Sequence, residues 1–233
     1  FFCTGHRIAR FSVFIHSSLI FHTHFFIISL RNTFRLENTE IMKNLVIGQS
    51  GGPTAVINAS LYGAVKAFRE SGADGHVLGM INGIEGFLAD HVMDLSTDLS
   101  DKELELLKLT PAAYLGSCRY KLPEDLSDPV YPELFQKFTE KEISYFFYIG
   151  GNDSMDTVLK LSEYAERIGS NVRIIGIPKT IDNDLMVTDH TPGFGSAAKY
   201  IASSLLEIAH DTFIYAVKSV TIVEIMGRDA GWL

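Results

Sequence analysis

The sequence has 233 residues, of which 46 % are hydrophobic and 21 % are charged, and its formal net charge is −8 at pH 7. A chain of this length can bury a sizeable hydrophobic core. The acidic balance and the lack of a Lys/Arg block disfavour nucleic acid as a partner, because proteins that bind it usually carry a basic patch. The cysteines, Cys3 and Cys118, match neither a disulfide framework nor a zinc site, which favours a reducing, cytoplasmic setting.

The first apolar stretch of the chain is FSVFIHSSLIFHTHFFIISL, residues 11–30. Histidines and serines interrupt it, so it is a poor membrane span, and no clear small-residue cleavage site follows it. The histidines lack the other ligands of a metal site. Met42 begins MKNLVIGQSGG, which is typical of the start of an α/β domain. We therefore expect residues 1–41 to be a non-native leader or disordered extension, residues 42–233 to form the folded part, and no membrane to be involved.

From residue 44 onward, apolar runs alternate with helical patterns. The predicted strands are 44–48, 76–81, 144–151, 172–178 and 219–227, and the predicted helices are 53–71, 96–109, 132–143, 153–169 and 194–213. Such alternation predicts a doubly wound α/β fold with a mostly parallel sheet and helices on both faces. Ligands of such sheets bind outside the carboxyl ends of the strands. The chain stops just after the last predicted strand, so we expect a C-terminally truncated domain.

The first strand is followed by GQSGGPTAVINA, residues 48–59. Gly51 and Gly52 would let the backbone approach an anion closely, and the helix that follows would offer free N–H groups. The pattern is not a P-loop, because it has no G-K-[ST]. A tight turn between a strand and a helix uses glycine as readily, so this motif alone decides nothing.

Further polar groups follow at later strand ends. YLGSCRY (114–120) contains Arg119, which could hold a phosphate or lie on the surface. IGGNDSMD (149–156) places Asn152 and Asp153 at a helix start, where they could cap the helix or form part of a loop for metal and phosphate. The two glycines before them favour the second reading.

The segment IPKTIDNDL, residues 177–185, carries the strongest signal. In an extended segment Asp182 and Asp184 would point to the same side, and Lys179 would offset their mutual repulsion. Phosphoryl transfer to a hydroxyl needs a base on the acceptor and cations on the moving phosphate, which this segment can supply. A turn held by the side chain of Asn183 is the alternative, but it does not account for Lys179 and both aspartates.

Two motifs close the series. TPGFGSA (191–197) opens a helix with two glycines and a serine, and EIMGRDAGW (224–232) places Arg228 after a predicted strand. The planar guanidinium of arginine suits a sugar phosphate.

Taken together and in this order, over nearly all of residues 42–233, these motifs resemble the phosphofructokinase family. The resemblance implies transfer of a phosphoryl group to the 1-hydroxyl of fructose 6-phosphate, giving fructose 1,6-bisphosphate, with Mg²⁺ as cofactor. It implies that Asp182 accepts the proton of that hydroxyl. The other residues that it assigns are Thr180, Ile181, Asp182, Met226, Gly227 and Arg228 for the sugar phosphate, Gly52 and Arg119 for the phosphoryl donor, and Asn152 and Asp184 for the metal. Asn152 stands where the family usually has aspartate, so this metal ligand would be uncharged.

The nature of the donor depends on Asp153 and Lys179, where ATP-dependent members typically carry glycine. This pair resembles the pyrophosphate-dependent branch. A carboxylate at 153 would repel the α-phosphate of a nucleotide, whereas a lysine at 179 could stabilise charge on the transferring and leaving phosphates. We therefore expect pyrophosphate as donor, and we count both residues as catalytic together with Asp182. The resemblance also implies a homo-oligomer, since the family completes its sites with residues beyond 233 and often with a neighbouring subunit.

Two alternatives remain open. The first is the same reaction with ATP as donor. The second is a non-catalytic regulatory subunit on the same fold, which the presence of Asp182 and Arg228 disfavours. A nucleotide-dependent oxidoreductase is poorly supported, because no G-x-G-x-x-G follows the first strand.

Overall fold

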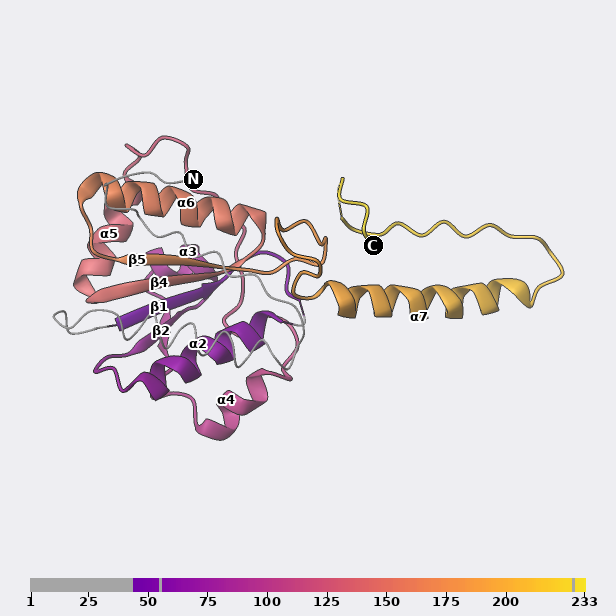
Figure 1. The fold of residues 1–233 in the computed structure, drawn as a ribbon, viewed down its shortest axis with the longest axis horizontal. Coiled ribbons are helices and arrows are strands. Elements are labelled where there is room, and N and C mark those ends of the chain that lie inside the picture. Colours follow the sequence, from indigo (N-terminus) through magenta and orange to yellow (C-terminus); the bar gives the residue numbers. More distant parts are fainter. Residues whose placement is uncertain (1–43, 55, 228) are drawn as a thin grey trace.

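The computed structural model describes residues 44–54, 56–227 and 229–233, so the predicted leader 1–41, with Cys3, lies outside the described residues. The described chain contains a five-stranded sheet of order β3-β2-β1-β4-β5 (Figure 1). The strands are β1 (Asn44–Gln49), β2 (Val77–Met80), β3 (Val92–Asp94), β4 (Ile143–Gly150) and β5 (Arg173–Pro178). β1, β2, β4 and β5 run parallel, whereas the short edge strand β3 pairs antiparallel with β2. The prediction of a mostly parallel sheet is confirmed.

Helices cover both faces of this sheet. They are α2 (Ile57–Ser71), α3 (Gly83–Leu88), α4 (Asp101–Leu107), α5 (Val130–Glu140) and α6 (Asn152–Ile168), and α7 (Phe194–Phe213) follows them. Successive strand residues point to opposite faces. Leu45 and Ile47 accordingly belong to the core under α2 and α4. Val46 belongs to the separate core under α3, α5 and α6. The doubly wound arrangement follows from these two cores.

The parallel register brings three strand ends to one edge of the sheet. Gln49 pairs with Ile149, and Gly150 pairs with Pro178. The backbone N–H of Lys179 then donates to the carbonyl of Gly150 at 2.9 Å. The loops that follow β1, β4 and β5 therefore begin side by side, as expected for the ligand-binding edge of such a sheet.

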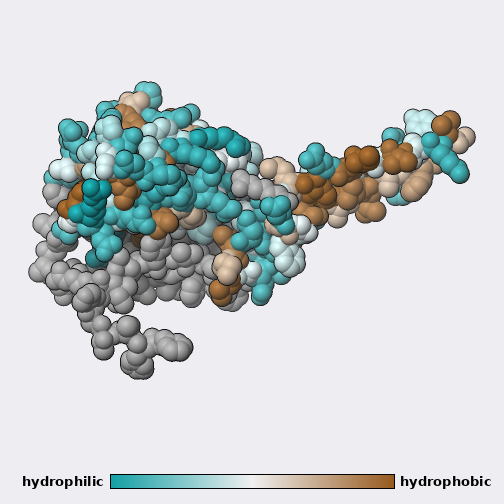
Figure 2. Space-filling view, turned by 90° about the horizontal axis from the view of Figure 1, so that it is seen from above, coloured by the Kyte–Doolittle hydropathy of each residue, from teal (hydrophilic) through white to brown (hydrophobic). Residues whose placement is uncertain are grey.

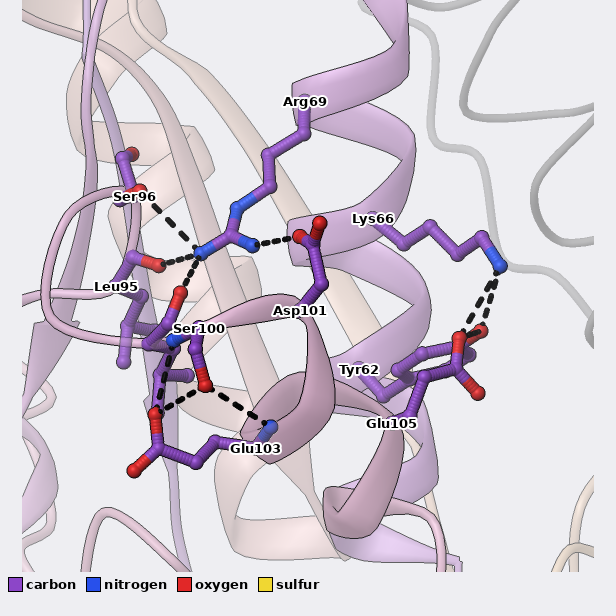
Figure 3. Close-up of polar contacts among 10 residues, drawn as sticks. Tyr62, Lys66, Arg69, Leu95, Ser96, Ser100, Asp101, Glu103 and Glu105 are labelled. Carbon is purple, nitrogen blue, oxygen red and sulfur yellow. Dashed lines mark hydrogen bonds and ion pairs between the residues drawn. The ribbon is translucent and has the colours of Figure 1, made fainter.

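A second polar cluster lies away from this edge and joins α2 to the segment that leads into α4 (Figure 3). The guanidinium of Arg69 donates to the carbonyls of Leu95 at 2.8 Å and Leu99 at 2.6 Å, and it pairs with Asp101 at 3.1 Å. These bonds satisfy backbone groups that no strand or helix pairs. The cluster is a structural clamp between elements.

Two predicted helices are shorter than the sequence suggested. The helix predicted for 53–71 begins only at Ile57, because the residues before it form the loop after β1, in which Gly51 has a φ of 77°. The helix predicted for 96–109 spans only 101–107. Ser100 accepts from the backbone N–H of Glu103, and the Glu103 side chain accepts from Ser100, so this capping box fixes the start of α4.

The strand predicted for 219–227 is wrong. This segment forms neither helix nor strand in the structure, and it runs back beside α7, outside the sheet (Figure 1). Val220 and Ile222 are 89 % and 90 % exposed. A strand needs a neighbouring strand to satisfy its backbone groups, and no strand of the described chain lies next to this segment. Helix α7 also projects from the sheet, and no helix of the described residues is long and apolar enough to cross a membrane.

Candidate active site

The glycine loop after β1 is fixed by backbone bonds to the segment around Cys118. The N–H of Gly51 donates to the carbonyl of Cys118 at 3.2 Å, and the hydroxyl of Ser117 donates to the carbonyl of Gly51 at 2.6 Å. Gly51 has a φ of 77°, which a residue with a side chain adopts only with strain. A Cβ at Gly52 would contact nothing within 4 Å, so this part of the loop is open.

Lys179 lies directly behind that loop. Its side chain crosses from the end of β5 and donates to the carbonyl of Gly52, although the residue is only 6 % exposed. Burial lowers the pKa of Lys179 below its usual value; the charge of Asp182 opposes this shift, and that of Arg119 adds to it. The structure thus brings Gly52, Arg119, Lys179 and Asp182, which lie far apart in the sequence, into one electrostatic environment.

The backbone around Asp182 differs from the sequence expectation. Asn183 has a φ of 57°, so residues 182–184 do not form the extended segment that was expected. Instead, the backbone N–H of Asp182 donates to the hydroxyl of Thr180 at 3.0 Å, and Asp182 stays half-buried. The turn held by the side chain of Asn183 is present, and it accompanies the charged groups rather than replacing them.

The two predicted metal ligands lie in contact. The amide of Asn152 donates to the carboxylate of Asp184 at 3.2 Å, across the gap between the loops after β4 and β5. An amide and a carboxylate from two loops suit Mg²⁺, which usually takes few protein oxygens and completes its shell with water and phosphate. Within the described residues, no group of three or more His, Cys, Asp or Glu side chains could hold a metal.

Helix α6 begins at this point without a side-chain cap. Its N-cap is Gly151, and Asn152 and Asp153 are its first helical residues, so neither acts as the cap that the sequence left as an alternative. Uncapped N–H groups at a helix start favour an anion. Asp153 pairs with Lys121 at 3.2 Å. Lys121 was not predicted as part of the site, although its position two residues after Arg119 could have indicated a second cation near the start of α6.

The remaining assigned residues belong to two separate segments of the chain. Thr180 and Ile181 are half-buried beside Asp182. Met226 is 77 % exposed, and it lies with Gly227 on the segment that runs back beside α7 (Figure 1). Arg228 lies outside the described residues. Their assignment to the sugar phosphate therefore stays a prediction.

The comparisons with known proteins agree with this geometry. The family model for phosphofructokinase matches residues 44–233. A pyrophosphate–fructose 6-phosphate 1-phosphotransferase of Halomonas elongata is 46 % identical over 194 residues, which are 82 % of this chain and 46 % of that protein. A protein of the same name from Xanthomonas campestris is 47 % identical over 193 residues, covering 82 % of this chain and 46 % of that protein.

A solved structure of a phosphofructokinase is also similar to this chain. The pyrophosphate-dependent phosphofructokinase of Marinobacter aquaeolei is 46 % identical, with a TM-score of 0.65 over 73 % of this chain and 42 % of that one. The chain thus spans about half the length of the relatives that it matches. The family model covers most of the described residues and includes every loop of the site, and so the chain belongs to the phosphofructokinase family.

Proposed function

We propose that the full-length protein containing this chain is a pyrophosphate-dependent phosphofructokinase, which transfers a phosphoryl group from pyrophosphate to the 1-hydroxyl of fructose 6-phosphate. The observation that carries the proposal is the position of Lys179, whose buried ammonium lies on the glycine loop, together with Asp153 at the start of α6. The relatives at 46 % and 47 % identity are named for pyrophosphate as donor, which supports the same choice.

In this reaction Asp182 takes the proton of the 1-hydroxyl. The hydroxyl oxygen forms a new bond to the transferring phosphorus as the bridging P–O bond of pyrophosphate breaks, and orthophosphate leaves with the electron pair of that bond. Lys179 and Arg119 would offset the charge on the transferring and leaving groups. The lowered pKa of Lys179 is consistent with an ammonium that gains a favourable partner when a phosphate arrives.

The choice of donor follows from charge and size. Asp153 would face the α-phosphate of a nucleotide and repel it, whereas pyrophosphate is short enough to avoid that carboxylate. The ion pair with Lys121 at 3.2 Å reduces the local negative charge, so a polyanion can still approach the start of α6. Its free N–H groups would add to the binding of phosphate.

Asn152 and Asp184 are the residues that would hold Mg²⁺ in this proposal, and their contact at 3.2 Å supports the pairing. When bound, Mg²⁺ neutralises phosphate charge and orients the phosphoryl group. Since Asn152 is uncharged, Asp184 would supply the only protein charge of this pair. The fructose 6-phosphate site would consist of Thr180, Ile181 and Asp182 with Met226, Gly227 and Arg228. We further propose that the protein is a cytoplasmic homo-oligomer.

A donor assay tests the proposal. The full-length protein is supplied with fructose 6-phosphate, Mg²⁺ and either pyrophosphate or ATP, and formation of fructose 1,6-bisphosphate is measured. We expect turnover with pyrophosphate and none with ATP. Turnover with ATP alone would contradict the donor assignment but keep the reaction. Binding of fructose 6-phosphate without turnover on either donor would indicate a regulatory subunit.

The double variant Asp153→Gly with Lys179→Gly locates the cause of the preference. We expect it to lose at least about tenfold in the ratio of kcat/KM for pyrophosphate to that for ATP, which corresponds to about 1.4 kcal/mol. An unchanged ratio would show that other residues select the donor.

A further inference from the structure

The loop that follows Asp182 is closed by one side chain, that of Asn183. Its amide nitrogen donates to the carbonyl of Asp189 at 3.1 Å, and its amide oxygen accepts from the backbone N–H of Thr191 at 2.8 Å. One partner can only accept and the other can only donate, so both ends of the amide are used in a single orientation. Asn183 thereby fixes the return path of the chain from 183 to 191.

Thr191 carries the connection back to the catalytic segment. Its hydroxyl donates to the carbonyl of Thr180 at 2.8 Å, and the residue is only 3 % exposed. The hydroxyl of Thr180 in turn accepts from the backbone N–H of Asp182 at 3.0 Å. Hydrogen bonds thus connect both sides of Asp182. Asn183, the next residue, bonds to Thr191, Thr191 bonds to Thr180, and Thr180 bonds to the backbone of Asp182. We use the name Asn183 clasp for the three bonds of Asn183 and Thr191 together with the bond between Asp182 and Thr180.

Backbone conformation at both ends of the clasp supports a fixed arrangement. Asn183 has a φ of 57°, a left-handed conformation that asparagine adopts more readily than most residues. Gly193 has a φ of 100° and makes an isolated parallel bridge to Thr180. A Cβ at Gly193 would lie 3.2 Å from Cγ2 of Ile181, which is a tight contact, and the φ of 100° would strain any residue with a side chain.

We propose that Asn183 and Thr191 are positioning residues for Asp182. Each holds the backbone on one side of Asp182, and the polar side-chain atoms of both residues bond to backbone groups. The clasp fixes where the carboxylate stands relative to the acceptor hydroxyl. This inference rests on the proposed function for the role of Asp182 as base. A general base must lie within hydrogen-bond reach of the proton that it takes, and a displacement of about 1 Å can lower the rate about 10²-fold.

The test compares two substitutions at one position in the full-length protein. Thr191→Val removes the hydroxyl at nearly constant volume, and Thr191→Ser restores it. We expect Thr191→Val to lower kcat about 10- to 100-fold while KM for fructose 6-phosphate and pyrophosphate changes less than about threefold, and Thr191→Ser to keep kcat within about threefold. Asn183→Ala should reproduce the loss of kcat. Thr188→Val is the matched control, because the hydroxyl of Thr188 bonds only locally, to the carbonyl of Met186 at 3.3 Å.

Hydrogen exchange of the backbone amides from 180 to 194 is measured on the same proteins. Faster exchange in Thr191→Val together with its loss of kcat supports the proposal. Faster exchange with an unchanged kcat would overturn it, because the clasp would then be structural only. If the wild type turns over with ATP alone, the donor assignment fails and the same comparison is made with ATP. If the wild type shows no turnover with either donor, the proposed function fails, and the positioning role fails with it, whatever the exchange shows.

Discussion

Residues 44–193, the body, and residues 194–227, the arm, differ in what covers their apolar side chains. In the body, strand residues such as Ile47 and Phe147 are fully buried between helices on both faces of the sheet. In the arm, no residue of α7 is buried, and Phe213 is 82 % exposed. Figure 2 shows hydrophobic surface along the part that projects from the molecule. An apolar pattern therefore indicates which face of an element is suited to burial, but it does not show which other element would bury it.

The same division separates the predicted site residues. The glycine loop, Lys179, the Asp182 segment and the start of α6 all belong to the body, and the sheet edge brings them together. Met226 and Gly227 belong to the arm, and Met226 is 77 % exposed. The assigned groups of the body rest on buried cores, whereas no residue of α7 in the arm is buried.

The largest expected effect concerns the body. In the full-length protein, Asp182→Asn removes the carboxylate that we propose as the base but keeps the size of the side chain, so kcat should fall about 10²- to 10⁴-fold. Initial rates at saturating substrate measure it. Asp189→Asn is the matched control, because Asp189 contributes its backbone carbonyl to the clasp and its side chain is exposed. A normal kcat in Asp182→Asn would remove Asp182 from the mechanism.

The next effect concerns the core of the body. Phe147 is fully buried, so Phe147→Ala should lower the free energy of unfolding by about 3–5 kcal/mol. Urea unfolding of the 233-residue chain, followed by circular dichroism, measures the change. Phe147→Leu should lose less, and it keeps the test informative if the alanine variant does not fold. A loss below about 1 kcal/mol for Phe147→Ala would show that this core is not as closely packed as the structure has it.

A structural feature is predicted well from the sequence when the interactions that determine it lie within a short segment of the chain. The bounds of α7 were predicted as 194–213 and are observed there, because helix bonds form within a segment. The strand predicted for 219–227 failed although its residues are as apolar as those of β4, because a strand depends on a neighbour that the sequence pattern does not specify. The antiparallel edge strand β3 was missed, since it has only three residues.

The site shows the same limit. Asp182, Lys179 and Gly52 follow strands whose ends meet at one edge, so their proximity could be predicted. Arg119 lies between α4 and α5, and it was assigned from the family resemblance. The ion pair of Lys121 with Asp153 was not predicted, because it joins two loops that only the folded chain brings together. The conformation after Asp182 was also missed: a left-handed φ at Asn183 is stabilised by partners at 189 and 191, which lie beyond the motif itself.

A smaller effect should follow from the pKa of Lys179. Burial lowers the pKa of Lys179 in the folded chain below 10.5, its value in the unfolded chain. At pH values between these two pKa values the unfolded chain holds more protons than the folded one, so the free energy of unfolding rises with pH. At pH values below the pKa of the folded state, the unfavourable contribution of Lys179 to the free energy of unfolding does not change with pH. Relative to Lys179→Met, the wild type should therefore gain stability as the pH approaches 10.5, and urea unfolding between pH 7 and 10 measures this.

Lys108→Met provides a control of opposite sign for that measurement. Glu105 raises the pKa of Lys108, so its favourable contribution is fully present below the unfolded value and is lost only as the pH rises through the higher, folded one. The difference between wild type and Lys108→Met should not increase from pH 7 to 10. A flat difference for Lys179→Met as well would mean that Lys179 is solvated in solution.

The smallest effect should come from the arm. Phe213→Ala makes the same chemical change as Phe147→Ala, but at a side chain that is 82 % exposed, so the free energy of unfolding of the 233-residue chain should change by no more than about 0.5 kcal/mol. Urea unfolding at two protein concentrations, tenfold apart, measures it. A loss that grows with concentration would show that a second copy covers the arm, and a large loss at both would show that the arm folds onto its own body. A loss near zero at both concentrations would agree with the exposure of Phe213 at the end of α7, against the full burial of Phe147 in β4. The difference between body and arm would then lie in what packs against their apolar side chains and not in the residue types of the arm.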